Sequence, residues 1–348
     1  MGICTSKKND NYRTLEKEQQ KSVNKNNYNN NRVNEDLIFS EDFKNNRQND
    51  KIKEEKYNKI TNIAVRKNNN YEDGIYYRGE SKNNLPNGKG VLHYPNGKVK
   101  YEGDYLKGKF EGNGAYIWED GDYYIGQWKN GLRNGKGTQY YSNRNVNYDG
   151  EYINDKAEGN GTFIWKDGYY YMGQFKNGFL HGKGEYYNPQ KKIIYRGDFI
   201  KGERDGNGIY HYENGECYNG EWKDGLRNGK GIQYYSNGKP LYNGNWVDDK
   251  YEGYGKYYTE EDYIYIGSFK NDLPNGKGTL YDAYWNIIYK GDWVNGKYEG
   301  NGTYNYTEGG YYEGQWKNDE RNGKGILYDS KGNIELEGNW INDEFVES

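Results

Sequence analysis

The feature that most constrains this chain is a fourteen-residue sequence that occurs three times. YIGQWKNGLRNGKG spans residues 124 to 137, YNGEWKDGLRNGKG spans 218 to 231 and YEGQWKNDERNGKG spans 312 to 325, so the copies lie 94 residues apart. Weaker copies fill the intervals, and their spacing alternates between 24 and 23 residues. The copies open at Tyr77, Tyr101, Tyr124, Tyr148, Tyr171, Tyr195, Tyr218, Tyr242, Tyr265, Tyr289, Tyr312 and, truncated, at Leu336. A fixed period of this length is typical of a repeat array.

The residues within each repeat predict a β-hairpin. Counting from the opening residue as position 1, position 3 is Gly in every copy, and position 5 is aromatic in all but the first, which has Ser81. Positions 1, 3 and 5 fall on one face of a strand. A Gly-x-Gly at positions 12 and 14 precedes a second aromatic strand, and pairs such as Asp120-Gly121 favour a tight turn. We expect an all-β fold, an elongated single-layer antiparallel sheet of tandem hairpins, with the tyrosine hydroxyl groups left in water.

The full pattern, Y-x-G-x-W-x-x-G-x-x-x-G-x-G, resembles the MORN (membrane occupation and recognition nexus) repeat from residue 77 to about 348. Position 8 departs from it, because Asn84, Asp155, Asp249, Asp272 and Asp319 replace Gly there. These residue types also tolerate turns. The resemblance implies an elongated, slightly twisted single-layer sheet. It also implies the settings in which such arrays occur: membrane–cytoskeleton junctions, membrane contact proteins, flagellar and cell-division structures of protists, and lipid kinases.

Composition divides the chain into two parts. Residues 1 to 70 contain one Gly, three Tyr and no Trp, whereas residues 71 to 348 contain 49 Gly and all nine Trp. The formal charge is +5 in the first part and −8 in the second. We expect a disordered Asn/Lys-rich tail over 1–70, with a short helix at 51–67, and a MORN array over 71–348 with eleven complete repeats from 77 and a C-terminal half repeat. Neither part has the basic excess of a nucleic-acid binder.

The first residues, MGICTS, match the N-myristoylation motif with Gly2 as the acceptor. Cys4 is a candidate palmitoylation site, and Lys7 and Lys8 add positive charge. A single myristoyl chain binds membranes only marginally, so a stable anchor needs a second signal. No stretch is apolar enough to span a bilayer. We therefore expect a protein that lies peripherally on the cytoplasmic face of a membrane.

Two lysine rows follow the 47-residue double repeat. In the 24-residue repeats position 6 is Lys82, Lys129, Lys176, Lys223, Lys270 or Lys317, and position 13 is Lys89, Lys136, Lys183, Lys230, Lys277 or Lys324. In the 23-residue repeats position 6 is aliphatic instead. One interpretation is that these lysines keep an exposed sheet soluble and discourage edge pairing. The other is that they form a docking surface for anionic lipid headgroups or an acidic filament. The row of acidic residues at position 4 argues against this second interpretation.

We expect no enzyme, cofactor or metal site in this sequence. The NGKG stretches lack the Ser or Thr that completes a phosphate-binding loop, and His93, His181 and His211 lie in different repeats without a recurrent acidic or Cys partner. The function that these patterns favour is a membrane-anchored scaffold that links a membrane to cytoskeletal or other scaffold proteins, with a homodimer left open. The alternative is a phosphoinositide-binding or lipid-kinase-regulating module, in which the array itself binds anionic lipid.

Overall fold

A computed structural model describes residues 74–346, which divide into two compact halves between Glu203 and Arg204. The predicted tail, its 51–67 helix and the lipidation candidates Gly2 and Cys4 lie outside the described residues. Every regular element that the structure describes is a strand. Among residues 74–346, no helix long and apolar enough to cross a membrane is found.

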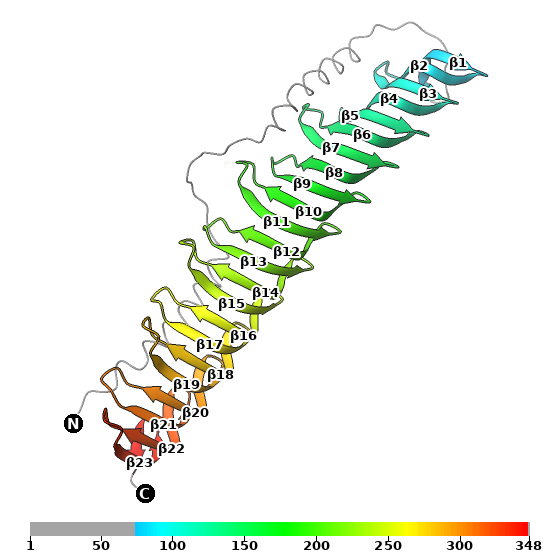
Figure 1. Ribbon diagram of the computed structural model, residues 1–348. Helices are drawn as coiled ribbons and strands as arrows, with labels where there is room; N and C mark the ends of the chain where they lie inside the picture. The colour runs from blue at the N-terminus through cyan, green and yellow to red at the C-terminus, as the bar shows by residue number, and fades with distance from the viewer. Residues whose placement is uncertain (1–73, 347–348) are drawn as a thin grey trace. The chain divides into compact units, whose positions relative to one another are not determined.

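The N-terminal half contains eleven strands, shown from cyan to green in Figure 1. They are β1 (Tyr76–Lys82), β2 (Leu85–His93), β3 (Val99–Leu106), β4 (Lys109–Ile117), β5 (Tyr123–Lys129), β6 (Leu132–Tyr140), β7 (Val146–Ile153), β8 (Lys156–Ile164), β9 (Tyr170–Lys176), β10 (Phe179–Tyr187) and β11 (Ile193–Ile200). Each pairs antiparallel with its sequence neighbours in this half.

The C-terminal half has the same construction. Its strands are β12 (Glu203–His211), β13 (Cys217–Lys223), β14 (Leu226–Tyr234), β15 (Pro240–Val247), β16 (Lys250–Tyr258), β17 (Ile264–Lys270), β18 (Leu273–Tyr281), β19 (Ile287–Val294), β20 (Lys297–Asn305), β21 (Tyr311–Lys317), β22 (Glu320–Tyr328), β23 (Ile334–Ile341) and β24 (Glu344–Val346). These strands also pair antiparallel in sequence order. One repeat is one hairpin, so the predicted all-β sheet of hairpins is confirmed. The final half repeat adds two strands, since the short β24 follows β23.

The glycines at positions 3 and 14 make room for the tyrosine at position 1. In the third repeat the ring of Tyr124 lies over Gly126 and its cross-strand partner Gly137, and a Cβ atom on either glycine would overlap that ring. The Tyr124 hydroxyl donates to the main-chain oxygen of Gln127, at 3.1 Å. The expectation that these hydroxyl groups stay in water is therefore wrong at position 1, where the rings are buried and their hydroxyls bond to the backbone.

The aromatic side chain at position 5 joins one repeat to the one before it. Trp128 Nε1 donates to the main-chain oxygen of Gly114, at 3.3 Å, and all six tryptophans at this position make the equivalent bond. The Trp128 ring also meets the Tyr124 ring edge to face, with centroids 5.3 Å apart. Aromatic rings at position 5 also contact the position-1 tyrosine of the preceding repeat, as Tyr152 contacts Tyr124, so the aromatic side chains form a continuous buried layer within each half.

The strand register shifts after position 3, and the side chain at position 4 stabilises this shift. Between Gly126 and Trp128 the pairing skips one residue of β5 and three of β6, so the position-13 residue Lys136 has no partner residue in β5. The side chain at position 4 accepts a hydrogen bond from the main chain of that residue: Lys136 N–H donates to Gln127 Oε1 at 2.8 Å. Six further repeats do the same, with Glu, Asp or Gln as the acceptor. The acidic row at position 4 is therefore part of the fold.

An arginine at position 10 recurs every 94 residues and binds the aspartate at position 8 of the following repeat. Arg227, at position 10, donates from its main-chain N–H and from Nε to Asp249 Oδ1, at 3.0 and 2.8 Å. Its guanidinium carbon lies 4.2 Å from the Trp246 ring centroid. The pairs Arg133–Asp155 and Arg321–Asp343 have the same geometry. Asp at position 8 adopts a positive φ, as a turn there requires, and also supplies a carboxylate that Gly lacks.

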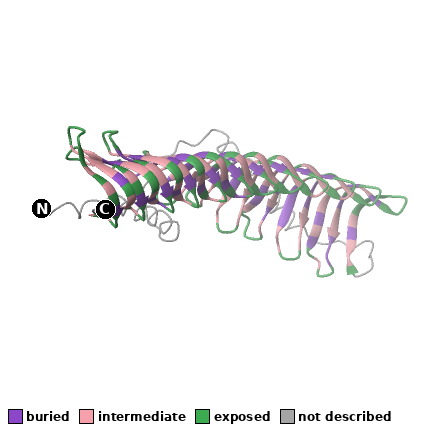
Figure 2. Cartoon of the chain, turned by 90° about the horizontal axis from the view of Figure 1, so that it is seen from below, coloured by how far each residue is buried: buried purple, intermediate pink, exposed green. Residues whose placement is uncertain are grey.

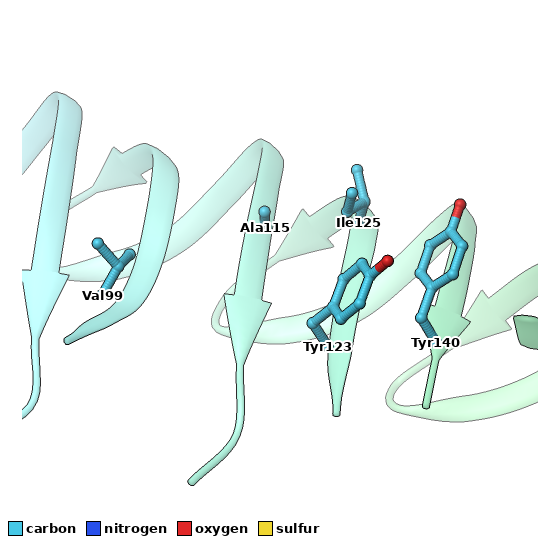
Figure 3. Close-up of a cluster of buried hydrophobic side chains, with 5 residues drawn as sticks. All are labelled: Val99, Ala115, Tyr123, Ile125 and Tyr140. Carbon is cyan, nitrogen blue, oxygen red and sulfur yellow. The ribbon is translucent and has the colours of Figure 1, made fainter. Parts of the chain in front are cut away.

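The opposite face of the sheet carries a smaller apolar cluster in the N-terminal half. Figure 3 shows Val99, Ala115, Tyr123, Ile125 and Tyr140, which come from strands β3 to β6. The Tyr123 and Tyr140 rings stack with centroids 4.5 Å apart. Elsewhere, Figure 2 shows exposed residues concentrated at the hairpin turns.

Candidate functional site

All twelve lysines predicted to form a docking surface are exposed. Side chains alternate between the two faces of a strand, so position 6 points away from the buried aromatic side chain at position 5. Lys82, Lys129, Lys176, Lys223, Lys270 and Lys317 therefore project from the face opposite the aromatic layer, beside the turn at positions 7 and 8. The position-13 lysines lie further along the hairpin, and each faces position 4 of the next repeat.

Four of the six position-13 lysines face an acidic residue, whereas Lys230 and Lys324 face asparagine. Lys183 Nζ lies 2.7 Å from Asp198 Oδ1, and Lys277 Nζ lies 2.7 Å from Asp292 Oδ1. Lys89 pairs with Asp104 in the same way. The charge of this row is therefore partly balanced within the sheet, and two of these acids, Asp104 and Asp292, also accept the main-chain hydrogen bond at the register shift. Such exposed ion pairs contribute little stability.

The position-6 lysines have different surroundings. Among residues 74–346, none of the six forms an ion pair within 4.0 Å. Their cross-strand neighbours at position 9 are apolar in five repeats: Leu85, Leu132, Phe179, Leu226 and Leu273, with Glu320 in the sixth. Two of these are strongly exposed, with 47% of Leu85 and 54% of Phe179 accessible to solvent.

The 23-residue repeats carry the reverse arrangement. Position 6 is Leu106, Ile153, Ile200, Val247, Val294 or Ile341, and position 9 is Lys109, Lys156, Glu203, Lys250, Lys297 or Glu344. The two positions are cross-strand neighbours in five of these repeats. Nearly every hairpin therefore presents one aliphatic or aromatic side chain next to one charged side chain, mostly Lys. We call positions 6 and 9 of all repeats the Lys–aliphatic ladder. The sequence pattern predicted only the position-6 half of this ladder, although position 9 also differs between the two repeat classes.

The ladder and its turns differ in charge between the two halves. Over positions 6 to 9, the N-terminal half has seven lysines and two acids, a net charge of +5. They are Lys82, Lys107, Lys109, Lys129, Lys156, Lys176 and Lys201, with Asp155 and Glu203. The C-terminal half has five lysines and eight acids, a net charge of −3. Of the two acids in the N-terminal half, Asp155 already binds Arg133. Only this half combines exposed apolar side chains with a clear positive excess.

The three histidines lie in separate surroundings. His93 is buried and stacks on Tyr76, with ring centroids 4.5 Å apart. Burial and the nearby Arg78 lower the pKa of His93. His181 lies in β10 and His211 in β12. Within the described residues, no group of three or more His, Cys, Asp or Glu side chains is placed to hold a metal ion.

Comparison with known proteins agrees with the repeat geometry. The MORN repeat matches residues 77–99, 101–123, 124–146, 148–168, 171–190, 195–217, 218–239, 242–260, 265–283, 289–311 and 312–334. No curated protein matches the chain. Among solved structures, the computationally designed Ika8 protein is 9% identical, with 79% of this chain and 86% of that chain covered. Its TM-score is 0.16, too low to support an inference. The eleven matched repeats show that this chain belongs to the MORN repeat family.

Proposed function

We propose that this protein is a non-enzymatic scaffold on the cytoplasmic face of a membrane. Its tail holds it there through acyl groups on Gly2 and Cys4, and its array presents surfaces to cytoskeletal or other scaffold proteins. A second copy of the chain is a further candidate partner. The observation that carries the proposal is the Lys–aliphatic ladder of the N-terminal half. Membership of the MORN repeat family supports it.

The ladder has the chemistry that an anionic membrane surface attracts. A Lys close to such a surface contributes about 1 kcal/mol, so seven of them are a substantial attraction even after screening. The apolar side chains beside them, such as Leu106 and Ile153, add favourable burial among the lipid headgroups. The tail precedes this half in the sequence, so an acyl anchor and the ladder would reinforce each other.

The second candidate function is an array that itself recognises anionic lipid, as a phosphoinositide-binding or lipid-kinase-regulating module. The six position-6 lysines favour it, because within the described residues they have no acidic partner closer than 4.0 Å. In this case the ladder alone determines membrane binding, and the acyl groups are dispensable.

The tail is tested by comparing the native protein with a Gly2→Ala variant in the same cells. We expect acyl mass on the native protein and its recovery with membranes, and an unmodified, soluble variant. Intact mass and membrane fractionation make the measurement. A native protein without acyl groups would contradict the proposal of a scaffold anchored by its tail.

The array is tested with the unacylated full-length chain and vesicles of phosphatidylcholine, with and without phosphatidylserine. Substituting Lys107→Glu, Lys109→Glu and Lys129→Glu in the N-terminal half should abolish co-sedimentation with anionic vesicles. The matched control is Lys223→Glu, Lys250→Glu and Lys270→Glu in the C-terminal half, which should change binding little. Wild-type binding that needs no anionic lipid, or equal losses in the two variants, would contradict a lipid role for the basic ladder.

A further inference from the structure

The turn between β18 and β19 exposes two adjacent aromatic side chains. It comprises residues 282–286, with the sequence DAYWN, and lies at the end of the hairpins opposite to the Lys–aliphatic ladder. Tyr284 is 85% exposed and Trp285 is 53% exposed. Almost all other large aromatic side chains in the described chain pack within the sheet. A surface-exposed Tyr–Trp pair is typical of residues that dominate protein interfaces.

Trp285 occupies a backbone position that favours glycine. Its φ is 67°, in the left-handed region, whereas the corresponding residue of the turn between β22 and β23 is Gly332, with φ 86°. Both turns are built alike: the Asp282 and Asp329 carboxylates each accept main-chain hydrogen bonds from residues two and four positions later. A glycine would therefore serve the fold without strain. Arg144, Lys191 and Asp262 occupy the same position with a similar positive φ in other turns, but Trp285 is the one aromatic residue among them. A bulky aromatic residue is unfavourable in this conformation, and such residues concentrate at functional sites.

The Trp285 ring already contacts a cation within this chain. Lys256 Nζ lies 4.9 Å from its ring centroid, and the Tyr281 ring is tilted against it at 5.6 Å. These contacts hold the indole in one orientation while half of its surface stays accessible. An indole attracts cations to its faces, and guanidinium groups stack on it best.

The turns beside Trp285 are acidic. The turns at 259–263, 282–286 and 306–310 follow one another along this edge of the C-terminal half, and they contain five acids and no Lys or Arg. The acids are Glu260, Glu261, Asp262, Asp282 and Glu308. Asp262 is partly balanced by Lys239 of the preceding turn, at 2.8 Å, and Asp282 is used within its own turn. Glu261 and Glu308 are exposed on the two sides of the aromatic pair.

We propose that Tyr284 and Trp285, with the acidic turns beside them, bind a basic Arg- or Lys-rich segment of a protein partner. The aromatic pair supplies stacking surfaces for guanidinium groups and alkyl stems, and the glutamates supply charge complementarity. An anionic membrane is a poor occupant, because the same carboxylates repel it. The inference goes beyond the lipid-binding role, uses the other edge of the hairpins and stands independently of it.

The test uses the full-length unacylated chain, without lipid, and a fluorescein-labelled nona-arginine peptide, with fluorescence anisotropy as the readout. We expect saturable binding that weakens with salt. Trp285→Gly should weaken it by about tenfold or more, as loss of a hot-spot residue does. The same variant should melt at an equal or higher temperature, because the strained backbone is relieved. Glu261→Gln combined with Glu308→Gln should weaken binding and reduce its salt dependence.

Tyr254→Asn is the matched control, since Tyr254 is 64% exposed but lies at position 13, where other repeats have Asn. It should bind as the wild type does. Equal binding by Trp285→Gly and the wild type would mean only general attraction to an acidic array, and would overturn the proposal. A large drop in melting temperature for Trp285→Gly would identify a structural residue instead, and would also overturn it. Comparable binding of a nona-glutamate peptide would exclude the proposed partner chemistry.

Discussion

The smallest complete unit of this fold is one tyrosine lying over two glycines. Tyr218 covers Gly220 and Gly231 and donates its hydroxyl proton to the main-chain oxygen of Glu221, at 2.9 Å. The contact buries a large ring against the backbone of the sheet, and it satisfies the polar end of that ring. Gly is needed because any Cβ at these two positions would occupy the space of the ring.

Gly231→Ala should therefore destabilise the protein by roughly 2 to 4 kcal/mol through overpacking against Tyr218. The φ of Gly231 is not positive, so the loss comes from the collision alone. Urea unfolding measures it. Adding Gly231→Ala to Tyr218→Ala should cost much less than it does alone, because the ring it strikes is gone. Strictly additive losses would contradict the overlap.

The same tyrosines make the protein sensitive to alkali. Burial raises the pKa of Tyr312 to about 12, and it raises the pKa of eight of the other ten tyrosines at position 1 further. The stabilisation is complete below about pH 10, where the unfolded phenol is protonated, and falls as pH rises toward the folded pKa. Between these two pKa values, the stabilisation that each buried tyrosine contributes falls by roughly 1.4 kcal/mol per pH unit.

Unfolding should therefore be steep and cooperative above about pH 10, with tyrosinate absorbance and loss of the β-sheet circular dichroism signal changing together. A large tyrosinate signal from a chain that keeps its sheet signal would show that the rings are accessible in the folded state.

At the scale of the hairpin, side chains connect each turn to its neighbours. The carboxylate at position 8 accepts from position 10 of the preceding repeat, as Asp249 does from Arg227 and Asp319 does from the Tyr298 main chain. Where position 10 is Arg, the guanidinium also bonds to the turn and covers an aromatic ring. Asp at position 8 and Arg at position 10 of the preceding repeat act together in three places, Arg133–Asp155, Arg227–Asp249 and Arg321–Asp343.

Asp249→Gly restores the consensus residue, yet it should destabilise the protein by about 2 kcal/mol, because the buried Arg227 loses its acceptor. Asp319→Gly is the matched control. It removes the carboxylate that accepts the main-chain hydrogen bond of Tyr298, where no guanidinium depends on it, and it relieves a positive φ of 72°, so its effect should stay below about 1 kcal/mol. Equal effects in thermal denaturation would show that the guanidinium does not need the carboxylate.

Sequence periodicity was enough to predict the hairpins, because each pairs residues that are close in the chain and marks its turns with Gly, Asn or Asp. The register shift after position 3 could not be predicted, since no residue type announces it. Because of this shift, the side chains at position 4 accept main-chain hydrogen bonds, whereas the sequence alone suggested only a charged row on the surface. The Arg227–Asp249 contact joins different repeats and needs the structure. In the sequence, Trp285 differs from the equivalent residue of the turn between β22 and β23, which is Gly332, but its exposure and its contacts need the structure.

At the scale of the whole molecule, stability is a sum of contacts between neighbouring hairpins. In each half every strand contacts the strands that precede and follow it, and within residues 74–346 no second layer of strands holds distant repeats together. Such arrays open from their ends. The short β24 covers only part of β23, and its last described residues, such as Val346, are exposed.

Native-state hydrogen exchange should therefore show the least protection in β23 and β24 and increasing protection toward the interior strands of the C-terminal half. Mass spectrometry of peptides from each hairpin measures the gradient. Uniform protection across β12 to β24 would indicate a single cooperative unit and contradict the nearest-neighbour description.

The alternation of charge and apolar surface along the Lys–aliphatic ladder also restricts how a gene for such a chain can change length. Unequal recombination that removed one 23-residue repeat would place two repeats of the same class side by side, with Lys beside Lys at position 6. Loss or gain of 47 residues would leave every junction as it is now. Length variants that keep the surface intact should therefore differ by whole pairs of hairpins, and the heritable unit of this protein is twice its structural repeat.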